Sequence, residues 1–230
     1  MRITLIIAFL LFVVHQSFAQ RYRLYPEMEI SSLAMNEGEL VLMNGDVIQG
    51  DLGLATVETS SGLQRINSVR MRKGSERLKF KAKEIKEIRI KANWSDQTLS
   101  EANSGDGLQI QLYSEAKADY YIFKNVTDKK GKPRLMQLLN PGFDHAIQVF
   151  VDPKSKDSAF ASLVGKDTAK SYYLTRDDGQ DGIYVKKSKY KKSFAGFFGD
   201  CAAIMAEFKD NIKWGDFAQH IYYYDQNCDE

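Results

Sequence analysis

Residues 39–52 read ELVLMNGDVIQGDL, so that two apolar-rich runs flank the turn-forming residues Asn44, Gly45 and Asp46. An Asn-Gly pair between such runs is the strongest short-range signal for a tight β-hairpin. We therefore expect strands over residues 40–43 and 47–52. Gly50 lies inside the second strand and predicts a bulge or a sharp bend, which small barrels use to turn corners.

The strand pattern continues after this hairpin. Leu78 and Phe80 alternate with bases, which predicts a strand with one buried face and one solvated face. Further strands are expected over 55–59, 63–69, 77–81 and 87–91. Residues 38–92 are accordingly predicted to form a first antiparallel β module, either a small barrel or a curled sheet.

A second β module is predicted after a polar interval. Residues 93–107 contain turn formers and few apolar residues, which indicates a linker. The second module is assigned to residues 108–187, with strands over 108–113, 120–125, 135–139, 147–151, 171–175 and 183–187. The predicted fold class is mainly β, and more precisely α+β, because helices are expected only at the C-terminal end.

After Ser188 the apolar period changes from two to about 3.6, which is typical of helices. Apolar and aromatic residues recur at steps of three or four from Tyr190 to Phe208, and again from Trp214 to Cys228. Two or three helices are expected in residues 188–230, the last two forming a C-terminal helical hairpin. Asp200 is expected to cap the helix that follows it, and a further helix should start near Asp216.

The chain has only two cysteines, Cys201 and Cys228. They fall at the start of the penultimate predicted helix and at the end of the last one, and these ends are neighbours in an antiparallel hairpin. Oxidation is the default fate of such a pair outside the cytoplasm. We expect a structural disulfide that stabilises the fold by about 3 to 4 kcal/mol on the chain-entropy model.

The beginning of the chain indicates export. Residues 1–19 combine the early charge of Arg2 with an apolar run over 3–14 and small residues at Ser17 and Ala19, which is the pattern of a cleavable signal peptide. The apolar run is too short to span a bilayer, so no transmembrane segment is expected in the mature chain. Residues 20–37 are interpreted as a lead-in arm. The expected location is the periplasm, the outer-membrane surface or the medium.

Composition points to a globular protein without a strong overall charge. Hydrophobic residues make up 43% of the 230 residues and aromatic residues 12%, and the formal net charge is +2. A chain of this composition is expected to fold, and its net charge does not recruit nucleic acid.

Charged residues are nevertheless sorted along the sequence. Residues 26–60 hold seven acids and no base, whereas residues 65–91 hold eleven bases and three acids. One explanation is that acidic and basic strands lie side by side in a sheet. The other is an exposed face for an anionic ligand, formed by Arg65, Arg70, Arg72, Lys73, Arg77, Lys79, Lys81 and Lys83, with Lys86, Arg89 and Lys91 continuing the segment.

No motif for catalysis, for a cofactor or for a metal ion is recognisable. Whether the chain is an enzyme stays open at this point, although the sequence favours a protein without catalytic residues. A carboxylate-dependent hydrolase acting on envelope glycans or peptides is the alternative, because the spacing of its two acids is set by the fold and leaves no sequence signature.

Two parts of the chain carry a resemblance to a known group of proteins. The segments LVLMNGDVIQGDL and RLKFKAKEIKEIRI, with Phe198-Gly199-Asp200-Cys201 and the stretch from Tyr224 to Cys228, resemble exported proteins of Bacteroidota-type bacteria. The resemblance implies an N-terminal strand-NGD-strand module and a terminal helical hairpin, and it implies no activity. The first hairpin is also similar to that of Sm-like small barrels.

Together these patterns predict an exported binding or scaffolding module of the bacterial cell envelope. Its expected partners are an envelope protein or an anionic polysaccharide, and nucleic acid is not expected. A structural role in an outer-membrane complex is a third reading.

Overall fold

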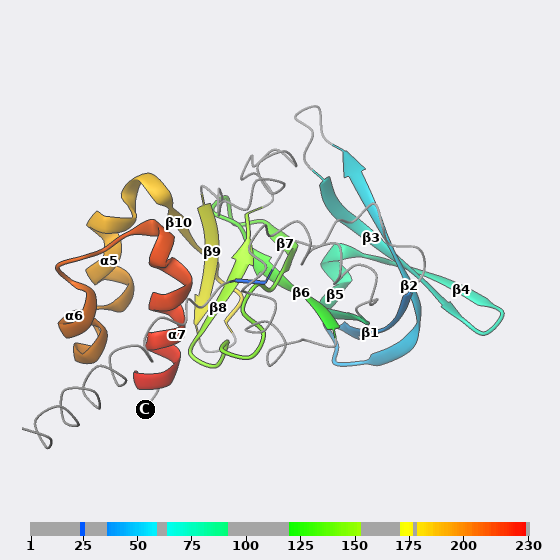
Figure 1. Ribbon diagram of the computed structural model, residues 1–230. Helices are drawn as coiled ribbons and strands as arrows, with labels where there is room; N and C mark the ends of the chain where they lie inside the picture. Colours follow the sequence, from blue (N-terminus) through cyan, green and yellow to red (C-terminus); the bar gives the residue numbers. More distant parts are fainter. Residues whose placement is uncertain are drawn as a thin grey trace, which may run out of the picture.

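The computed structural model of the chain describes residues 24–25, 36–58, 64–91, 120–152, 171–176 and 179–228. The predicted leader, most of the predicted arm, the predicted linker and the strand expected over 108–113 lie outside these residues. The described part is mainly β, with antiparallel sheets followed by C-terminal helices, as the sequence predicts (Figure 1).

The larger sheet of the described residues has seven strands in the order β4-β3-β2-β1-β5-β6-β7, and all neighbouring strands are antiparallel. Its strands are β1 (Asn36–Leu42), β2 (Val47–Glu58), β3 (Gln64–Lys73), β4 (Glu76–Lys81), β5 (Ile85–Lys91), β6 (Tyr120–Thr127) and β7 (Pro133–Gln137). A 3₁₀ helix, η2 (Ala82–Glu84), connects β4 to β5. The two strands expected over 47–52 and 55–59 are a single strand, β2.

The hairpin predicted at the Asn-Gly pair is present between β1 and β2. Gly45 has a φ of 91°, a backbone conformation that favours glycine. The backbone N–H of Leu42 donates to the carbonyl of Asp46 at 2.9 Å, and the side chain of Asn44 accepts from the N–H of Asp46 at 3.1 Å. The local turn chemistry therefore sets the register in which β1 and β2 pair.

Of the two alternatives predicted for Gly50, the bulge is absent. The register of β1 and β2 runs without interruption through the pair Gly38 and Gly50, so there is no bulge there. A Cβ atom on Gly50 would lie 2.5 Å from the carbonyl oxygen of Arg72, and one on Gly38 would lie 2.5 Å from the carbonyl oxygen of Arg89. Both glycines are required because neighbouring backbone approaches too closely for a side chain.

The larger sheet is curled but does not close into a barrel. Strands β3 and β7 approach each other although four strands separate them in the sheet order, and η2 contacts both. Closing the predicted first module into a barrel would require β4 to pair with β5. The edge of β5 that would be needed pairs with β6 instead, and β7 follows β6. The expectation of a small barrel is therefore wrong.

The sheet also continues across the predicted boundary between the two modules. Strands β6 and β7 come from the segment assigned to the second module, yet they extend the sheet built by β1 to β5. The antiparallel register of β5 with β6 aligns Ile88 with Phe123 and Ile90 with Tyr121, and all four side chains are buried. Apolar burial on both sides of the boundary thus makes one continuous sheet.

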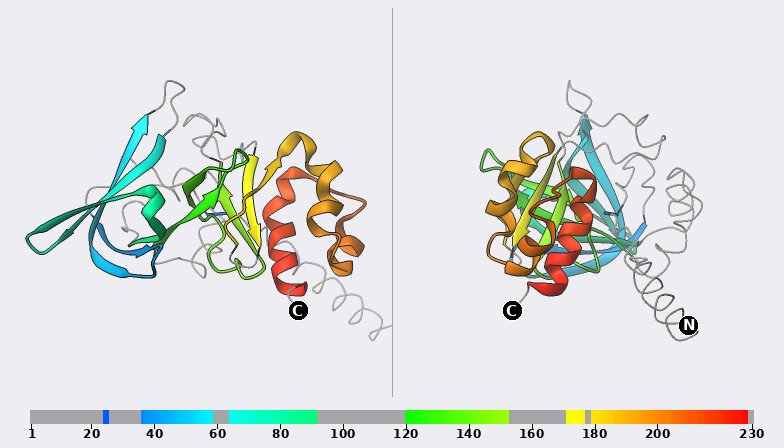
Figure 2. Two further views of the ribbon diagram at one scale, coloured as in Figure 1. Left: turned by 180° about the vertical axis from the view of Figure 1, so that it is seen from behind. Right: turned by 60° about the vertical axis from the view of Figure 1, so that its left-hand side comes forward.

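A smaller sheet contains β8 (Ile147–Val151), β9 (Ser171–Arg176) and β10 (Ile183–Lys186) in the order β10-β9-β8. Its two faces pack against different neighbours. Val149 and Leu174 point toward the C-terminal helices, whereas Phe150 and Tyr173 pack with Val126 and Met136 of the larger sheet and with Leu138, which follows β7. Because both faces are covered, β8 and β9 are buried along almost their whole length (Figure 2).

The C-terminal helices form the third layer, against the face of the smaller sheet that is turned away from β6 and β7 (Figure 1). They are α5 (Tyr190–Phe198), α6 (Ala202–Phe208) and α7 (Phe217–Asn227), with 3₁₀ turns η3 (Lys187–Lys189) and η4 (Trp214–Asp216) before α5 and α7. The aromatic stripes lie in the core as predicted, and Tyr190, Phe194, Phe198 and Phe217 are fully buried.

Cys201 immediately precedes α6 and Cys228 immediately follows α7. The two residues form a disulfide with a Cα–Cα distance of 5.5 Å. The cysteine pair predicted from the sequence is thus at disulfide distance, and it joins the ends of two helices 27 residues apart in the chain.

Candidate basic binding surface

Opposite charges face each other across the centre of the larger sheet. The acidic strands β1 and β2 lie between the basic strands β3 and β5. Three ion pairs result, between Asp51 and Arg72 (2.7 Å), Glu37 and Lys91 (3.1 Å), and Glu39 and Arg89 (3.6 Å). The side-by-side explanation of the charge pattern therefore holds for these strands, although exposed pairs of this kind contribute only about 0 to 1 kcal/mol each.

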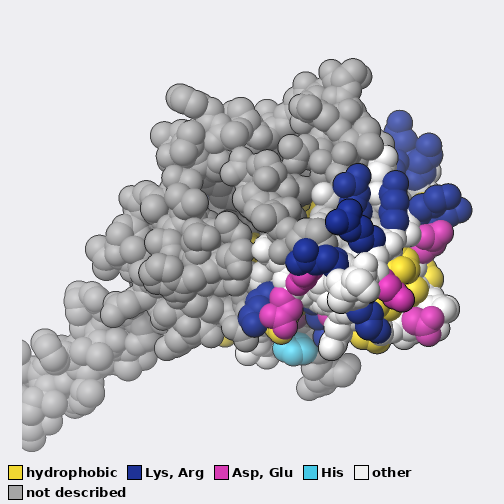
Figure 3. Space-filling view, turned by 90° about the vertical axis from the view of Figure 1, so that its right-hand side faces the viewer, with side chains coloured by type: hydrophobic (Ala, Val, Ile, Leu, Met, Phe, Trp, Pro, Cys, Tyr) yellow, Lys and Arg dark blue, Asp and Glu magenta, His cyan; other side chains and the backbone are white. Residues whose placement is uncertain are grey.

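The outermost strand, β4, has no acidic neighbour in the described part of the chain, because its only partner there is the basic strand β3. Six bases on or next to it are exposed and form no ion pair with another described residue. We call them the basic surface: Arg70, Lys73, Arg77, Lys79, Lys81 and Lys83. Figure 3 shows dark-blue Lys and Arg side chains gathered at this end of the molecule, with fewer acidic side chains among them.

Like charges lie opposite each other within the basic surface. Arg70 is paired with Lys79 in the register of β3 and β4, and Arg77 is paired with Arg72, which lies beside the basic surface. Like charges directly opposite each other in a sheet are destabilising. Two acids lie beside these bases: Glu76 is paired with Lys73 in the register of β3 and β4, and the carboxylate of Glu84 accepts the backbone N–H of Lys81 at 2.8 Å. Six bases against these two acids leave a net positive charge on this part of the described structure.

The other predicted basic residues lie outside this surface. Arg72 is neutralised by Asp51, and Arg89 and Lys91 by the acids of β1. Arg65 belongs to β3, where its backbone pairs with Val57, and its side chain lies outside the described part of the structure. Lys86 is exposed at the point where the register of β1 and β5 shifts.

A buried asparagine anchors the end of the basic surface to the body of the molecule. Asn125 of β6 donates from Nδ2 to the carbonyl oxygens of Ala82, at 3.2 Å, and Ile85, at 3.0 Å. These bonds satisfy the backbone at both ends of η2 and fix the place where β4 turns into β5. Lys81 and Lys83 are thereby held on a rigid corner of the sheet.

Among the described residues, the basic surface offers charge and hydrogen-bond donors but no aromatic ring. Leu78 and Phe80 of β4 alternate with the bases, so they point to the opposite face, where they pack against the core of the larger sheet. The described residues of the charged face therefore supply no ring on which a nucleobase or a sugar could stack. The arrangement can attract an anionic ligand through exposed charges, and such attraction weakens as salt is added.

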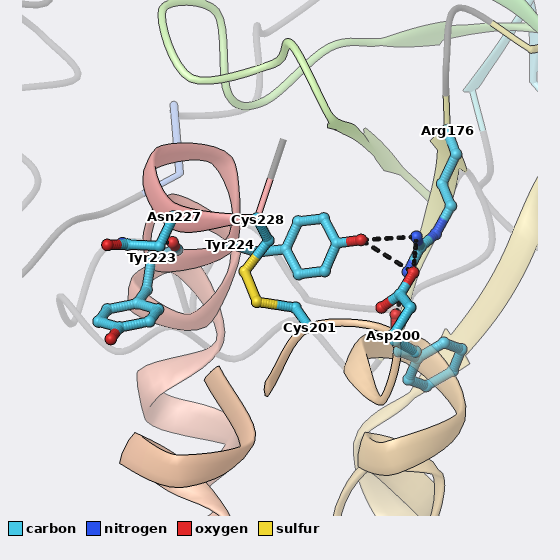
Figure 4. Close-up of a disulfide and its surroundings, with 8 residues drawn as sticks. Arg176, Asp200, Cys201, Tyr223, Tyr224, Asn227 and Cys228 are labelled. Atoms are coloured by element: carbon cyan, nitrogen blue, oxygen red, sulfur yellow. Dashed lines mark hydrogen bonds and ion pairs between the residues drawn. A yellow bond between two sulfur atoms is a disulfide. The ribbon is translucent and has the colours of Figure 1, made fainter. Parts of the chain in front are cut away.

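A second polar cluster lies beside the disulfide. Arg176, at the end of β9, donates from Nη1 to Asp200 at 2.5 Å and to the hydroxyl of Tyr224 at 2.8 Å, and from Nη2 to the carbonyl of Phe197. The Tyr224 hydroxyl in turn donates to Asp200 at 2.9 Å, as Figure 4 shows. This cluster ties the smaller sheet to the α5–α6 turn and to α7.

Asp200 does not cap α6, contrary to the sequence prediction. The residue at the cap position is Cys201, and no side chain caps the helix there. Partial burial would raise the pKa of Asp200, but the hydrogen bonds from Arg176 and Tyr224 outweigh it and lower that pKa below its ordinary value. The charge of the arginine, which comes from a distant strand, is a stronger partner than free helical N–H groups.

Two carboxyl groups among the described residues have a clearly shifted pKa, and both shifts are downward. For Asp128, burial opposes the shift, whereas the backbone N–H groups of Lys130 and Lys132 and the side chain of Arg134 lower the pKa. For Asp200 the direction is the same. A glycoside hydrolase needs one acid with a raised pKa to protonate the leaving group, so neither residue suits that role.

A histidine and a buried carboxylate meet at the end of α7. The carboxylate of Asp225 accepts the backbone N–H groups of His145, at 2.9 Å, and Ala146, at 3.2 Å, and lies 3.3 Å from His145 Nδ1. These bonds hold the loop before β8 against the helix. Within the described ranges, no group of three or more His, Cys, Asp and Glu residues is placed to hold a metal ion.

Sequence reasoning did not single out Arg176, and it named Tyr224 only as part of the terminal stretch that ends at Cys228. Their partner Asp200 lies 24 residues from each of them in the chain, so that no local spacing signals the contact. The basic surface was easier to find because its members lie close together in the sequence and, from Arg77 to Lys83, alternate with apolar residues.

Comparisons with protein-family models, with curated proteins and with solved structures find no match to this chain. In the part that the structure describes, no helix has the length and apolar character needed to span a membrane.

Proposed function

We propose that this protein is an exported, non-enzymatic binding module of a bacterial cell envelope that holds an anionic partner on the basic surface. The observation that carries the proposal is the set of six exposed bases without an ion-pair partner in the described structure. Charged surfaces of one sign attract ligands of the other sign and raise their association rate.

The surroundings of the basic surface support a binding role. The basic side chains lie on the β3–β4 hairpin, and Asn125 anchors the turn that follows β4. Binding a ligand therefore does not carry the entropic cost of ordering this backbone. The disulfide is compatible with an oxidising compartment such as the periplasm. The polyanions and acidic proteins of an envelope are the partners that this charge pattern fits.

Heparin is a suitable first probe, as a soluble anionic polysaccharide. We compare retention on immobilised heparin, as salt is raised, for the parent protein, the variant Arg70→Gln/Lys79→Gln and the control Lys186→Gln/Lys192→Gln. The control removes two exposed charges from β10 and α5 and leaves the basic surface intact. The expected result is earlier elution of the first variant and an affinity at low salt reduced about tenfold or more, with the control unchanged.

The result that contradicts the proposal is equal retention of both variants, or retention that does not change with salt. Neutralising Arg70 and Lys79 removes a like-charge pair, so loss of folding does not offer another explanation for weaker binding.

A further inference from the structure

In the described part of the structure, the outer edge of β4 has no neighbouring strand, so its outward hydrogen-bonding groups have no strand partner there. Residues Lys73 and Glu76 are paired across a two-residue turn, which makes them a hydrogen-bonded pair, and such pairs alternate along an antiparallel ladder. The N–H and carbonyl groups of Leu78 therefore face β3, whereas those of Arg77 and Lys79 face outward. The N–H of Lys81, which also faces outward, donates to Glu84, in agreement with this assignment.

The side chains of β4 divide between the two faces of the sheet. Arg77, Lys79 and Lys81 lie on the exposed charged face, and Leu78 and Phe80 on the face that packs against the core. A strand added to this edge would continue both faces. Its residues on the charged face would meet bases, and its residues on the other face would meet Leu78 and Phe80.

The sheet itself shows which charge belongs beside a basic strand. One row across the charged face contains Arg77, Arg72, Asp51, Glu37 and Lys91, in the order of the strands β4, β3, β2, β1 and β5. The basic strands β3 and β5 each have an acidic strand as one neighbour. In the described structure, β4 alone among the basic strands does not.

We propose that β4 binds a partner protein by strand addition, and that the partner segment is extended, with Asp or Glu at alternate positions and apolar residues between them. Backbone hydrogen bonds to Arg77 and Lys79 supply the pairing, and the acids opposite the bases supply the selectivity. The inference rests on the proposed function, because it assigns the anionic partner of the basic surface to an acidic strand.

The probe is a synthetic octapeptide of four Glu-Val repeats, compared with four Lys-Val repeats and with a Glu-Val peptide whose alternate backbone nitrogens are methylated. Titration of the labelled peptides is followed by fluorescence anisotropy. We expect the Glu-Val peptide to bind, the Lys-Val peptide not to bind and the methylated peptide to bind at least about tenfold more weakly, because it lacks backbone donors.

Two variants separate backbone pairing from charge. Lys79→Gln removes the charge only, whereas Lys79→Pro also removes the outward N–H, which β3 does not use, so that proline is tolerated at this edge. Lys79→Pro should weaken peptide binding about tenfold beyond Lys79→Gln, while the two variants elute alike from heparin.

Amide hydrogen exchange of the unaltered protein supplies a measurement that does not depend on the folding of any variant. Saturation with the Glu-Val peptide should slow exchange at Arg77 and Lys79 and leave Leu78, which already bonds to β3, unchanged. Equal binding of the methylated peptide, or unprotected Arg77 and Lys79 amides, overturns strand addition even when heparin still binds. Loss of heparin binding would instead contradict the proposed function itself.

Discussion

At the residue scale, His220 is a buried group whose protonation bears on stability. It is fully buried, its Nδ1 lies 2.8 Å from the hydroxyl of Tyr190, and its Nε2 has no hydrogen-bond partner among the described residues. Phe194 and Phe208 pack edge-on against its ring. Burial, opposed only weakly by Asp216, lowers the pKa of His220 from 6.5 to about 4.

The lowered pKa predicts a loss of stability in acid. In the unfolded chain His220 takes up a proton as the pH falls through 6.5, whereas in the folded protein it does so only near pH 4. The unfolded state therefore binds more protons in this window, and stability that is fully present above pH 6.5 is lost progressively down to pH 4. The loss amounts to about 3 kcal/mol.

The measurement is urea unfolding at pH 7 and at pH 4.5 for the parent and for His220→Gln. The variant His220→Gln should show a smaller loss of stability between the two pH values than the parent. An equal loss in parent and His220→Gln would show that protonation of His220 does not contribute.

Gly50 and Asp200 show which residue roles can be predicted from local sequence. Both were recognised as special, yet Gly50 is needed for the close approach of Arg72 and not for a bulge, and Asp200 binds Arg176 and not a helix end. Their roles depend on residues more than 20 positions away. Local patterns identify such residues but do not identify their partners.

At the element scale, the disulfide and the Arg176 cluster act on the same junction. Cys201 and Cys228 join the start of α6 to the end of α7. Asp200 comes directly before Cys201, Tyr224 comes four residues before Cys228, and the two side chains are hydrogen-bonded to each other. The covalent link constrains the unfolded chain, whereas the polar contacts stabilise only the folded one. Removing the disulfide should therefore destabilise the protein without separating the helix ends.

The variant Cys228→Ser tests this expectation. Closure of a 27-residue loop should contribute about 3 to 4 kcal/mol, so the melting temperature under oxidising conditions should fall by about 10 °C. Thermal unfolding followed by circular dichroism measures the difference, and in a reducing agent parent and variant should melt together. Equal melting under oxidising conditions would contradict a stabilising disulfide.

Strand positions were largely predictable from sequence, whereas strand order was not. Turn-forming residues and short apolar-rich runs located β1 to β10, because these signals depend only on local sequence. They do not tell which strands become neighbours, and β1 pairs with β5 from nearly 50 residues away. The sequence was therefore enough to name the basic residues. Only the order of the strands shows that Arg72 has an acidic partner, Asp51, and that Arg70 has none among the described residues.

At the scale of the whole molecule, the smaller sheet connects two apolar cores. One core lies inside the curled larger sheet, and the other lies between the smaller sheet and the helices. Between them Phe150 and Tyr173 pack against Val126, Met136 and Leu138, and Leu138 forms a bridge with Phe150. Because both β8 and β9 contribute side chains to two layers, unfolding of one layer should expose the other.

This connection predicts that the described layers unfold together and that Phe150 couples them. Phe150→Ala should cost about 3 to 5 kcal/mol, as expected for a fully buried phenylalanine, and should weaken the contact between the sheets. In a Trp94→Phe background, fluorescence of Trp214 reports on the helical layer and circular dichroism on the whole. The two urea transitions should coincide in the parent and separate in Phe150→Ala.

Val149→Ala, on the opposite face of β8, weakens the helical core but keeps the junction, so its transitions should still coincide. Coincident transitions in Phe150→Ala would mean that other contacts, such as the bond from the Leu139 N–H to the carbonyl of Val149, suffice to couple the layers.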